Sequence, residues 1–145
     1  MIVSYSKNDR YIAFAEIIGA VLVIGFWIGW FTGILKSFQP GDPFYDVYYA
    51  FESSFPLADA WIVVLLLISA YGILQEKFYG RFIAISAGGA LVFLGLIDVS
   101  FNLQQGIYME IFVDLAVIVE ILVNLACLIG GLFLIIWFTK MSNKN

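Results

Sequence analysis

The sequence predicts an all-α polytopic membrane protein: a four-transmembrane-helix bundle with a short amphipathic interfacial helix in its first outer loop. Of the 145 residues, 63% are hydrophobic and only 12% are charged, and the mean hydropathy is +0.99. A soluble domain of this size leaves too much surface in water to hide so many apolar side chains. Four apolar stretches are also long enough, at about 20 residues, to cross a bilayer. We therefore expect residues 1–145 to form a single transmembrane domain.

The four spanning helices are predicted at 11–34, 57–74, 82–101 and 112–138, each bounded by charged residues, Pro or Gly. The first stretch is not a signal peptide, because its apolar run is far longer than the usual ~7–15 residues and no A-x-A cleavage site follows it. We expect it to be retained as a membrane span.

The basic residues predict the orientation of these spans. Six of the seven Lys and Arg residues fall on one side of the predicted topology, and Lys36 alone falls on the other. Those six are Lys7, Arg10, Lys77, Arg81, Lys140 and Lys144. Because Lys and Arg near span ends are retained in the cytoplasm, we expect a multi-pass protein of the cell membrane with both termini cytoplasmic.

The outer loop between the first two spans predicts a further helix at 43–54. Asp42 followed by Pro43 is a typical helix start, with a capping acid and Pro at the first helical position. Phe44, Tyr48 and Phe51 then recur at helical spacing, as does Phe55. This pattern predicts an amphipathic helix at the outer interface with its aromatic side toward the membrane. The alternative is that the rings are simply an aromatic membrane belt.

Small residues predict where the helices touch. Gly25, Gly29 and Gly33 form an uninterrupted G-x-x-x-G-x-x-x-G in the first span, and Gly88 and Gly95 lie on one stripe of the third. In lipid, close backbone approach is a main source of helix association. We expect the stripe at 25–33 to make the closest helix contact, either within the bundle or across a homodimer.

The residues that are missing exclude several classes of function. The chain has no His, its only cysteine is Cys127, and no nucleotide-binding signature occurs. Haem or zinc sites with His ligands, imidazole catalysis and dithiol redox chemistry are therefore excluded. A net charge of −4 argues against nucleic acid. We expect no cofactor and no enzymatic activity, with carboxylates, tyrosines, amides and hydroxyls left for binding.

The carboxylates are the most informative polar residues. Eight of the eleven acids fall on the outer half, and most of these have a simple explanation as exposed residues or, like Glu110 and Asp114, as acids at a helix start. Asp98 and Glu120 lie inside apolar segments, where a charge is costly, so each needs a partner, a proton or a ligand. On the cytoplasmic side, Glu16 is interpreted as half of an ion pair with Arg10 or Arg81.

These acids predict one site in the outer third of the membrane. The stripe that carries Gly88 and Gly95 continues into Asp98 and Asn102, so we expect both side chains to face the bundle. The predicted ligand-binding residues are Glu52, Asp59, Asp98, Asn102 and Glu120, walled by Trp61, Tyr49 and Phe101; a metal ion, if one is bound, would use Asp59, Asp98 and Glu120. The alternative is that these acids are separate interfacial residues.

Two local resemblances accompany this pattern. The segment A-E-I-I-G at 15–19 resembles the start of small multidrug resistance transporters, which carry an essential Glu in such a setting, but those chains are shorter and lack the long outer loop. The segments at 51–61 and 93–102 are similar to parts of small four-helix prokaryotic membrane proteins of uncharacterised function. That similarity carries no activity, and implies only that Glu52, Asp59, Asp98 and Asn102 belong together.

Three functions fit these features. An outward-facing pocket of carboxylates and rings could bind or transport a metal ion, a proton-coupled cation or a cationic amphiphile. Alternatively, the chain is a non-catalytic accessory or structural subunit of a larger membrane complex, whose Lys or Arg residues neutralise the acids. An enzyme that acts on lipid with a carboxylate pair is the weakest of the three, because no nucleophile setting accompanies the acids.

Overall fold

The computed structural model describes residues 4–34, 40–110 and 115–142. Every secondary-structure element in this part of the chain is a helix. Its elements are α1 (Lys7–Thr32), α2 (Tyr45–Glu52), α3 (Pro56–Leu74), α4 (Tyr79–Gln105), the 3₁₀ helix η1 (Ile107–Glu110) and α5 (Leu115–Ser142). Helices α1, α3, α4 and α5 are long and apolar enough to cross a membrane. The predicted all-helical class with four apolar helices is therefore confirmed, and four such helices are what a multi-pass membrane protein would contain.

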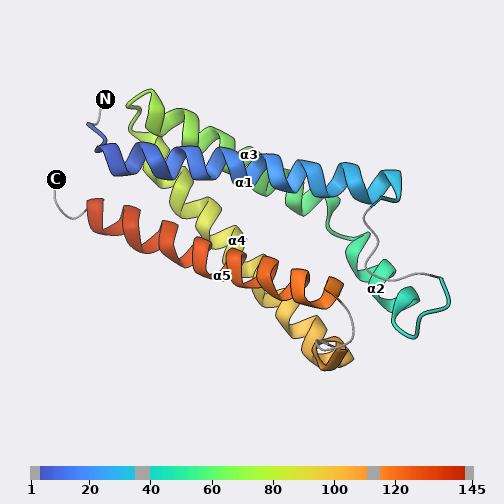
Figure 1. Cartoon of the computed structure of the whole chain (residues 1–145). Coiled ribbons are helices and arrows are strands. Elements are labelled where there is room, and N and C mark those ends of the chain that lie inside the picture. Colours follow the sequence, from blue (N-terminus) through green and yellow to red (C-terminus); the bar gives the residue numbers. More distant parts are fainter. Residues whose placement is uncertain (1–3, 35–39, 111–114, 143–145) are drawn as a thin grey trace.

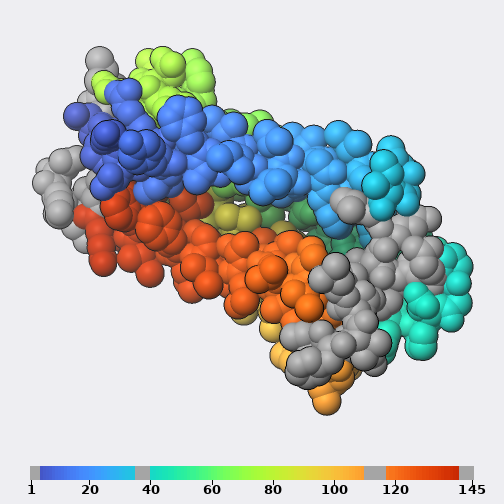
Figure 2. Space-filling model, viewed as in Figure 1, coloured from blue at the N-terminus to red at the C-terminus, as the bar shows by residue number. Residues whose placement is uncertain are grey.

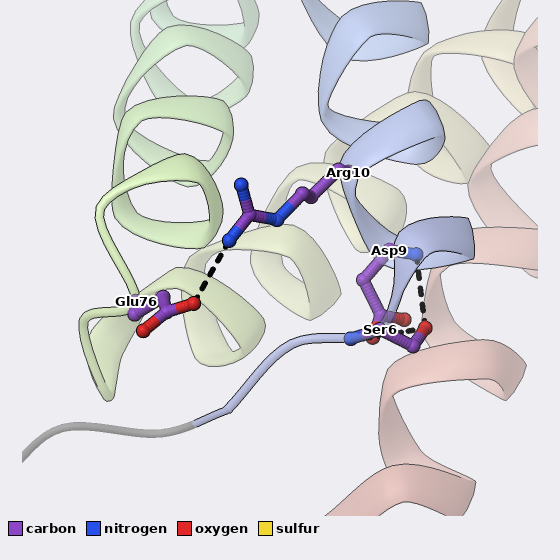
Figure 3. Close-up of polar contacts among 4 residues, drawn as sticks. All are labelled: Ser6, Asp9, Arg10 and Glu76. Carbon is purple, nitrogen blue, oxygen red and sulfur yellow. Dashed lines mark hydrogen bonds and ion pairs between the residues drawn. The ribbon is translucent and has the colours of Figure 1, made fainter.

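Helix α1 begins at Lys7, four residues before the predicted span, because a capping box starts it. The Ser6 hydroxyl accepts a hydrogen bond from the Asp9 N–H at 3.2 Å, and the Asp9 carboxylate accepts one from the Ser6 N–H at 2.6 Å (Figure 3). This reciprocal pair satisfies backbone groups that a helix start leaves free. The apolar pattern starts only at Tyr11, so hydropathy alone placed the boundary too late.

The other boundaries differ from the predictions by a few residues. Helix α3 matches the predicted 57–74 closely, whereas α4 runs beyond the predicted 82–101 at both ends and stops at Gly106, whose φ of 73° is the left-handed conformation of a helix C-cap. The predicted start of the last span at 112 lies outside the described residues, and α5 is described from Leu115.

Helix α2 carries its aromatic residues on one side, as predicted, but it begins later than predicted, and that side packs against the protein rather than facing the membrane. Asp42 and Pro43 form a turn, closed by a 3.1 Å hydrogen bond from the Tyr45 N–H to the Asp42 carbonyl, and the helix begins after it. Tyr48 is only 4% exposed, and the remaining aromatic residues of this face, Phe44, Phe51 and Phe55, are half-buried. The aromatic side of α2 thus packs against the protein itself.

The four long helices pack in sequence order, α1 on α3, α3 on α4 and α4 on α5. Both termini lie at one end of the bundle, here called the terminal end, and α2 lies at the other, here called the α2 end (Figure 1). The α1/α3 pair and the α4/α5 pair diverge toward the α2 end (Figure 1). In the space-filling view a furrow separates α1 from α5, with α3 and α4 visible at its bottom (Figure 2).

The closest helix packing involves glycines of α3, α4 and α5. A Cβ added to Gly88 would lie 2.6 Å from the carbonyl oxygen of Gly131, and one added to Gly95 would lie 2.9 Å from Leu128 Cγ. Gly72 and Gly80 meet in the same way where α3 and α4 join. Gly88 and Gly95 therefore lie at a helix contact, as small residues in membrane bundles often do.

The glycine stripe of α1 behaves differently. Gly29 is buried, but Gly25 is exposed, and a Cβ at Gly25 would meet no atom within 4 Å. Gly25 therefore takes no part in close packing within residues 4–34, 40–110 and 115–142. A contact of the stripe with a second copy stays a prediction.

Candidate functional site

The backbone between α2 and α3 places two of the predicted acids close together. Glu52 is the last residue of α2, and its carbonyl accepts a 3.0 Å hydrogen bond from the Phe55 N–H. Pro56 then opens α3, and the Asp59 N–H bonds to the Phe55 carbonyl at 2.9 Å. This tight turn holds Glu52 and the first turn of α3 at the α2 end, beside the ends of α4 and α5.

Asp59 is bonded to α1 rather than to another acid. The Trp27 indole Nε1–H donates to Asp59 Oδ2 at 2.9 Å, and Trp27 is only 8% exposed. The other oxygen, Oδ1, is buried without a hydrogen-bond partner in the described structure. Asp59 therefore keeps one free acceptor.

The tryptophan that contacts Asp59 is Trp27, whereas the sequence predicted Trp61 beside the site. Trp61 is 60% exposed, because residues two apart on a helix point in nearly opposite directions and Asp59 faces the bundle. The structure therefore places Trp61 on the surface of α3 rather than against Asp59. An indole donor on α1 could not be assigned from the sequence, because its partner is 32 residues away.

The two other predicted aromatic residues pack against neighbouring rings. Phe101 is half-buried and stacks on Phe51, with ring centroids 3.8 Å apart and planes 2° from parallel. Tyr49 is 47% exposed and stacks on Trp30 with ring centroids 5.7 Å apart. Phe101 joins α4 to α2 near Glu52, whereas Tyr49 lies at the surface.

Asn102 and Glu120 meet through a direct hydrogen bond between α4 and α5. Asn102 is fully buried and its Nδ2 donates to Glu120 Oε1 at 2.7 Å. Asn124 Nδ2 donates to the Tyr108 hydroxyl at 2.9 Å, and the Asn102 Nδ2 lies 3.5 Å from the same hydroxyl. Two acceptors of this network, Asn102 Oδ1 and Glu120 Oε2, are buried without partners in the described residues.

Two members of this network, Asn124 and Tyr108, were not among the predicted binding residues. Asn124 lies one turn after Glu120 on the same stripe of α5, and this spacing could have included it. Tyr108 comes from η1, whose short I-Y-M-E sequence carries no motif that points to a site.

Asp98 accepts no hydrogen bond from any residue that the structure describes, and its side chain is half-buried. The charge of Asp98 acts on Glu52, which lies outside the four long apolar helices. Burial, together with the charges of Asp98, Glu120 and Asp59, raises the pKa of Glu52 from 4.5 to about 8, and a hydrogen bond from Tyr48 opposes the rise only in part. Acids from α2, α3, α4 and α5 therefore act on one another electrostatically.

This coupling predicts that stability falls as the pH rises. With a pKa raised to about 8, Glu52 binds more protons in the folded than in the unfolded state between its ordinary pKa of 4.5 and about 8. Folding therefore loses stability as the pH rises across that window. We expect thermal unfolding in detergent to show a lower midpoint at about pH 9 than at about pH 5.

Glu52→Gln should remove about half or more of that difference, since the amide does not titrate. Asp46→Asn is the matched control, because Asp46 is an exposed acid of the same helix, and it should keep the full pH dependence. Equal pH dependence in the wild type and Glu52→Gln would contradict this coupling.

A metal ion held directly by these acids does not fit the geometry. Within the described residues no three Cys, Asp or Glu side chains are grouped closely enough to hold a metal ion. Asp59, Asp98 and Glu120 therefore do not form a metal centre in this structure.

An open, largely apolar hollow of about 470 Å³ lies beside the stacked rings, lined by Phe51, Phe93, Leu96, Ile97, Ser100, Phe101 and Gln104. The surroundings of Glu52 thus combine acids with apolar surface.

The terminal end has its own set of polar contacts. Glu16 is 4% exposed, and the Ser69 hydroxyl lies 2.8 Å from Glu16 Oε1 and 3.0 Å from Oε2. The predicted ion pair of Glu16 with Arg10 or Arg81 is wrong in this structure, because Arg10 instead pairs with Glu76 at 2.8 Å (Figure 3). Asp9 accepts from Trp137 Nε1 at 2.7 Å, which joins α1 to α5 at this end.

Comparison with known proteins finds no matching family model, no matching curated protein and no matching solved structure. The site is therefore interpreted from its own geometry. Glu110 and Asp114, assigned to a helix start by the sequence, contribute nothing to this interpretation, because the Glu110 side chain and the whole of Asp114 lie outside what the structure describes.

Proposed function

We propose that the acidic site at the α2 end binds an organic or amphipathic cation, which enters in exchange for protons. One observation carries the proposal: Asp59 Oδ1, Asn102 Oδ1 and Glu120 Oε2, from three different helices, are buried acceptors with no donor among the described residues. A buried acceptor without a partner costs about 1–3 kcal/mol, more when it is charged. Only a positive charge or a hydrogen-bond donor can satisfy all three atoms.

The cation is exchanged for protons because the acids act on one another. The raised pKa of Glu52 means that this carboxyl is largely protonated at neutral pH in the empty protein. A bound cation supplies the missing positive charge and lowers the cost of ionising the cluster. Binding is therefore coupled to proton release, which is the minimum that a proton-coupled transporter requires.

An organic cation suits the surroundings better than a bare metal ion. The described acids do not converge closely enough to coordinate a metal. Aromatic side chains lie near two of them, because Trp27 bonds to Asp59 and Phe51, the residue before Glu52, stacks on Phe101. Aromatic faces attract organic cations by about 0.5–2 kcal/mol. The apolar hollow beside Phe51 and Phe101 would accommodate the hydrophobic part of an amphiphile.

The test is equilibrium binding of tetraphenylphosphonium to the detergent-purified protein, with Mn²⁺ as a second probe. At about pH 8.5 we expect saturable binding of the organic cation that weakens about tenfold or more at pH 6, since protons compete for the acids. Tighter binding of Mn²⁺ than of the organic cation would overturn the choice of ligand. Failure of both probes would favour an accessory subunit, in which a basic side chain of another protein occupies the site.

The proposal also requires that the α2 end faces outward. Single cysteines placed at Ser4, Gln104 and Lys140 in a Cys127→Ser background test this, since all three residues are exposed. An impermeant thiol reagent applied to intact cells should label only the cysteine at position 104, in keeping with retention of Lys- and Arg-rich ends in the cytoplasm. Labelling at either terminal position would reverse the orientation and remove the site from the outer face.

A further inference from the structure

Arg81 is a buried cation at the terminal end, far from the acidic site. It is the third residue of α4 and only 8% exposed. Its backbone N–H donates to the Tyr5 hydroxyl at 3.1 Å. Two nitrogens of its guanidinium, Nε and Nη1, are buried and have no hydrogen-bond partner in the described residues. Its side chain therefore carries a positive charge and free donors into a site with little water.

The described surroundings of Arg81 supply rings but no ion-pair partner. Its Cζ atom lies 5.0 Å from the ring centroid of Phe78 and 4.8 Å from that of Phe82. Ring faces stabilise a cation by about 0.5–2 kcal/mol, whereas an uncompensated buried charge costs several kcal/mol. The contacts with the two rings are therefore too weak to replace an anion.

The acids of the same end are already bonded elsewhere. Glu76 pairs with Arg10, Glu16 bonds to Ser69, and Asp9 bonds to Ser6 and Trp137. None of these carboxylates forms an ion pair with Arg81. The missing negative charge must therefore come from outside the described part of the chain.

The local field also favours an anion from outside. The guanidinium lies beside the first turn of α4, a 27-residue helix whose N-terminus carries a partial positive charge. Lys7 is the first residue of α1, Lys77 lies between α3 and α4, and Lys140 lies in the last turn of α5, so all three belong to the terminal end, and all three are exposed. These charges raise the local concentration of anions around Arg81.

We propose that Arg81 is the centre of a phosphate-binding site at the terminal end, which takes the phosphate group of an anionic lipid or of a soluble phosphate compound. The planar guanidinium fork matches two phosphate oxygens, and such charge-assisted bonds are among the strongest that side chains form. Phe78 and Phe82, which cover the guanidinium, are 38% and 41% exposed, so rotation of these surface rings opens the way to its free donors. This site is independent of the proposed cation site.

The test measures thermal unfolding and native mass spectra of the detergent-purified protein with phosphatidylglycerol, phosphatidylcholine or inorganic phosphate. We expect phosphatidylglycerol to raise the unfolding midpoint by about 3 °C or more, while phosphatidylcholine does not. A matching rise with inorganic phosphate would support the site and assign it to soluble phosphates. No rise with either anion would overturn it.

The matched variants are Arg81→Gln and Arg10→Gln, which remove the same charge from the same end. Arg81→Gln should weaken retention of the anion about tenfold or more, and Arg10→Gln by less than about threefold, because Arg10 is exposed and already paired. Equal losses would show general charge attraction and overturn the proposal.

If Arg81→Gln does not fold, Arg81→Lys keeps the positive charge but lacks the planar guanidinium fork. It should still bind several-fold more weakly, and wild-type binding by Arg81→Lys would overturn the role of the fork.

Discussion

Gly88→Leu is expected to prevent the bundle from assembling. Even the Cβ of alanine at this position would lie 2.6 Å from the Gly131 carbonyl oxygen, and it would also approach Ile135 and Leu134 at 3.0 and 3.1 Å. Because the first of these atoms is backbone, no rotamer change relieves the clash, and α4 and α5 must separate. We expect the variant to lose its single peak in size-exclusion chromatography in detergent and its cooperative unfolding.

Gly89→Leu is the matched control, because it makes the same change at the next residue. A Cβ at Gly89 meets nothing within 4 Å, and the residue is exposed. This variant should unfold within a few degrees of the wild type, as surface changes usually do. If the two variants behave alike, the α4–α5 contact described here is not the one that holds the bundle together.

Asp98→Asn is expected to weaken cation binding strongly while the protein stays folded. The amide has nearly the shape of the carboxylate, and no hydrogen bond of the described residues depends on Asp98. Removing its charge takes away the strongest of the charge repulsions that raise the pKa of Glu52. We expect binding of tetraphenylphosphonium to weaken about tenfold or more, with an unchanged far-ultraviolet circular dichroism spectrum.

Asp98→Asn should also change the pH dependence of stability, which can be measured without a bound cation. Because Glu52 then faces fewer negative charges, its pKa should fall toward the ordinary value, and the pH at which stability drops should move lower. Asp46→Asn removes an exposed acid of α2 and should change neither binding nor this pH. An Asp98→Asn protein with wild-type affinity would exclude Asp98 from the site.

The helical class and the approximate spans could be predicted from the sequence because a bilayer imposes them. Backbone groups in hydrocarbon must form hydrogen bonds within their own segment, so a sufficiently long apolar segment forms a helix. Boundaries were less predictable, since Ser6 and Asp9 extend α1 by local hydrogen bonding that hydropathy does not register. Gly88 and Gly95 were identified as packing residues because small side chains have few other uses on a buried stripe.

The contacts of the candidate site were much less predictable. The position of Asn102 on a small-residue stripe predicted that it would face the bundle, and the structure buries it fully. Its bond to Glu120, and that of Trp27 to Asp59, depend on how the helices rotate against one another, which periodicity does not specify. Trp61 was chosen because it is near Asp59 in sequence, but helical geometry turns it to the surface.

The central claim is that a cation replaces protons among the coupled acids around Glu52. Isothermal titration calorimetry with tetraphenylphosphonium at about pH 7.5, repeated in buffers of different ionisation enthalpy, measures the protons released per cation bound. With the pKa of Glu52 raised to about 8, the group is largely protonated at that pH, so we predict release of about one proton. Binding with the same apparent enthalpy in every buffer, and thus no proton release, would contradict the claim.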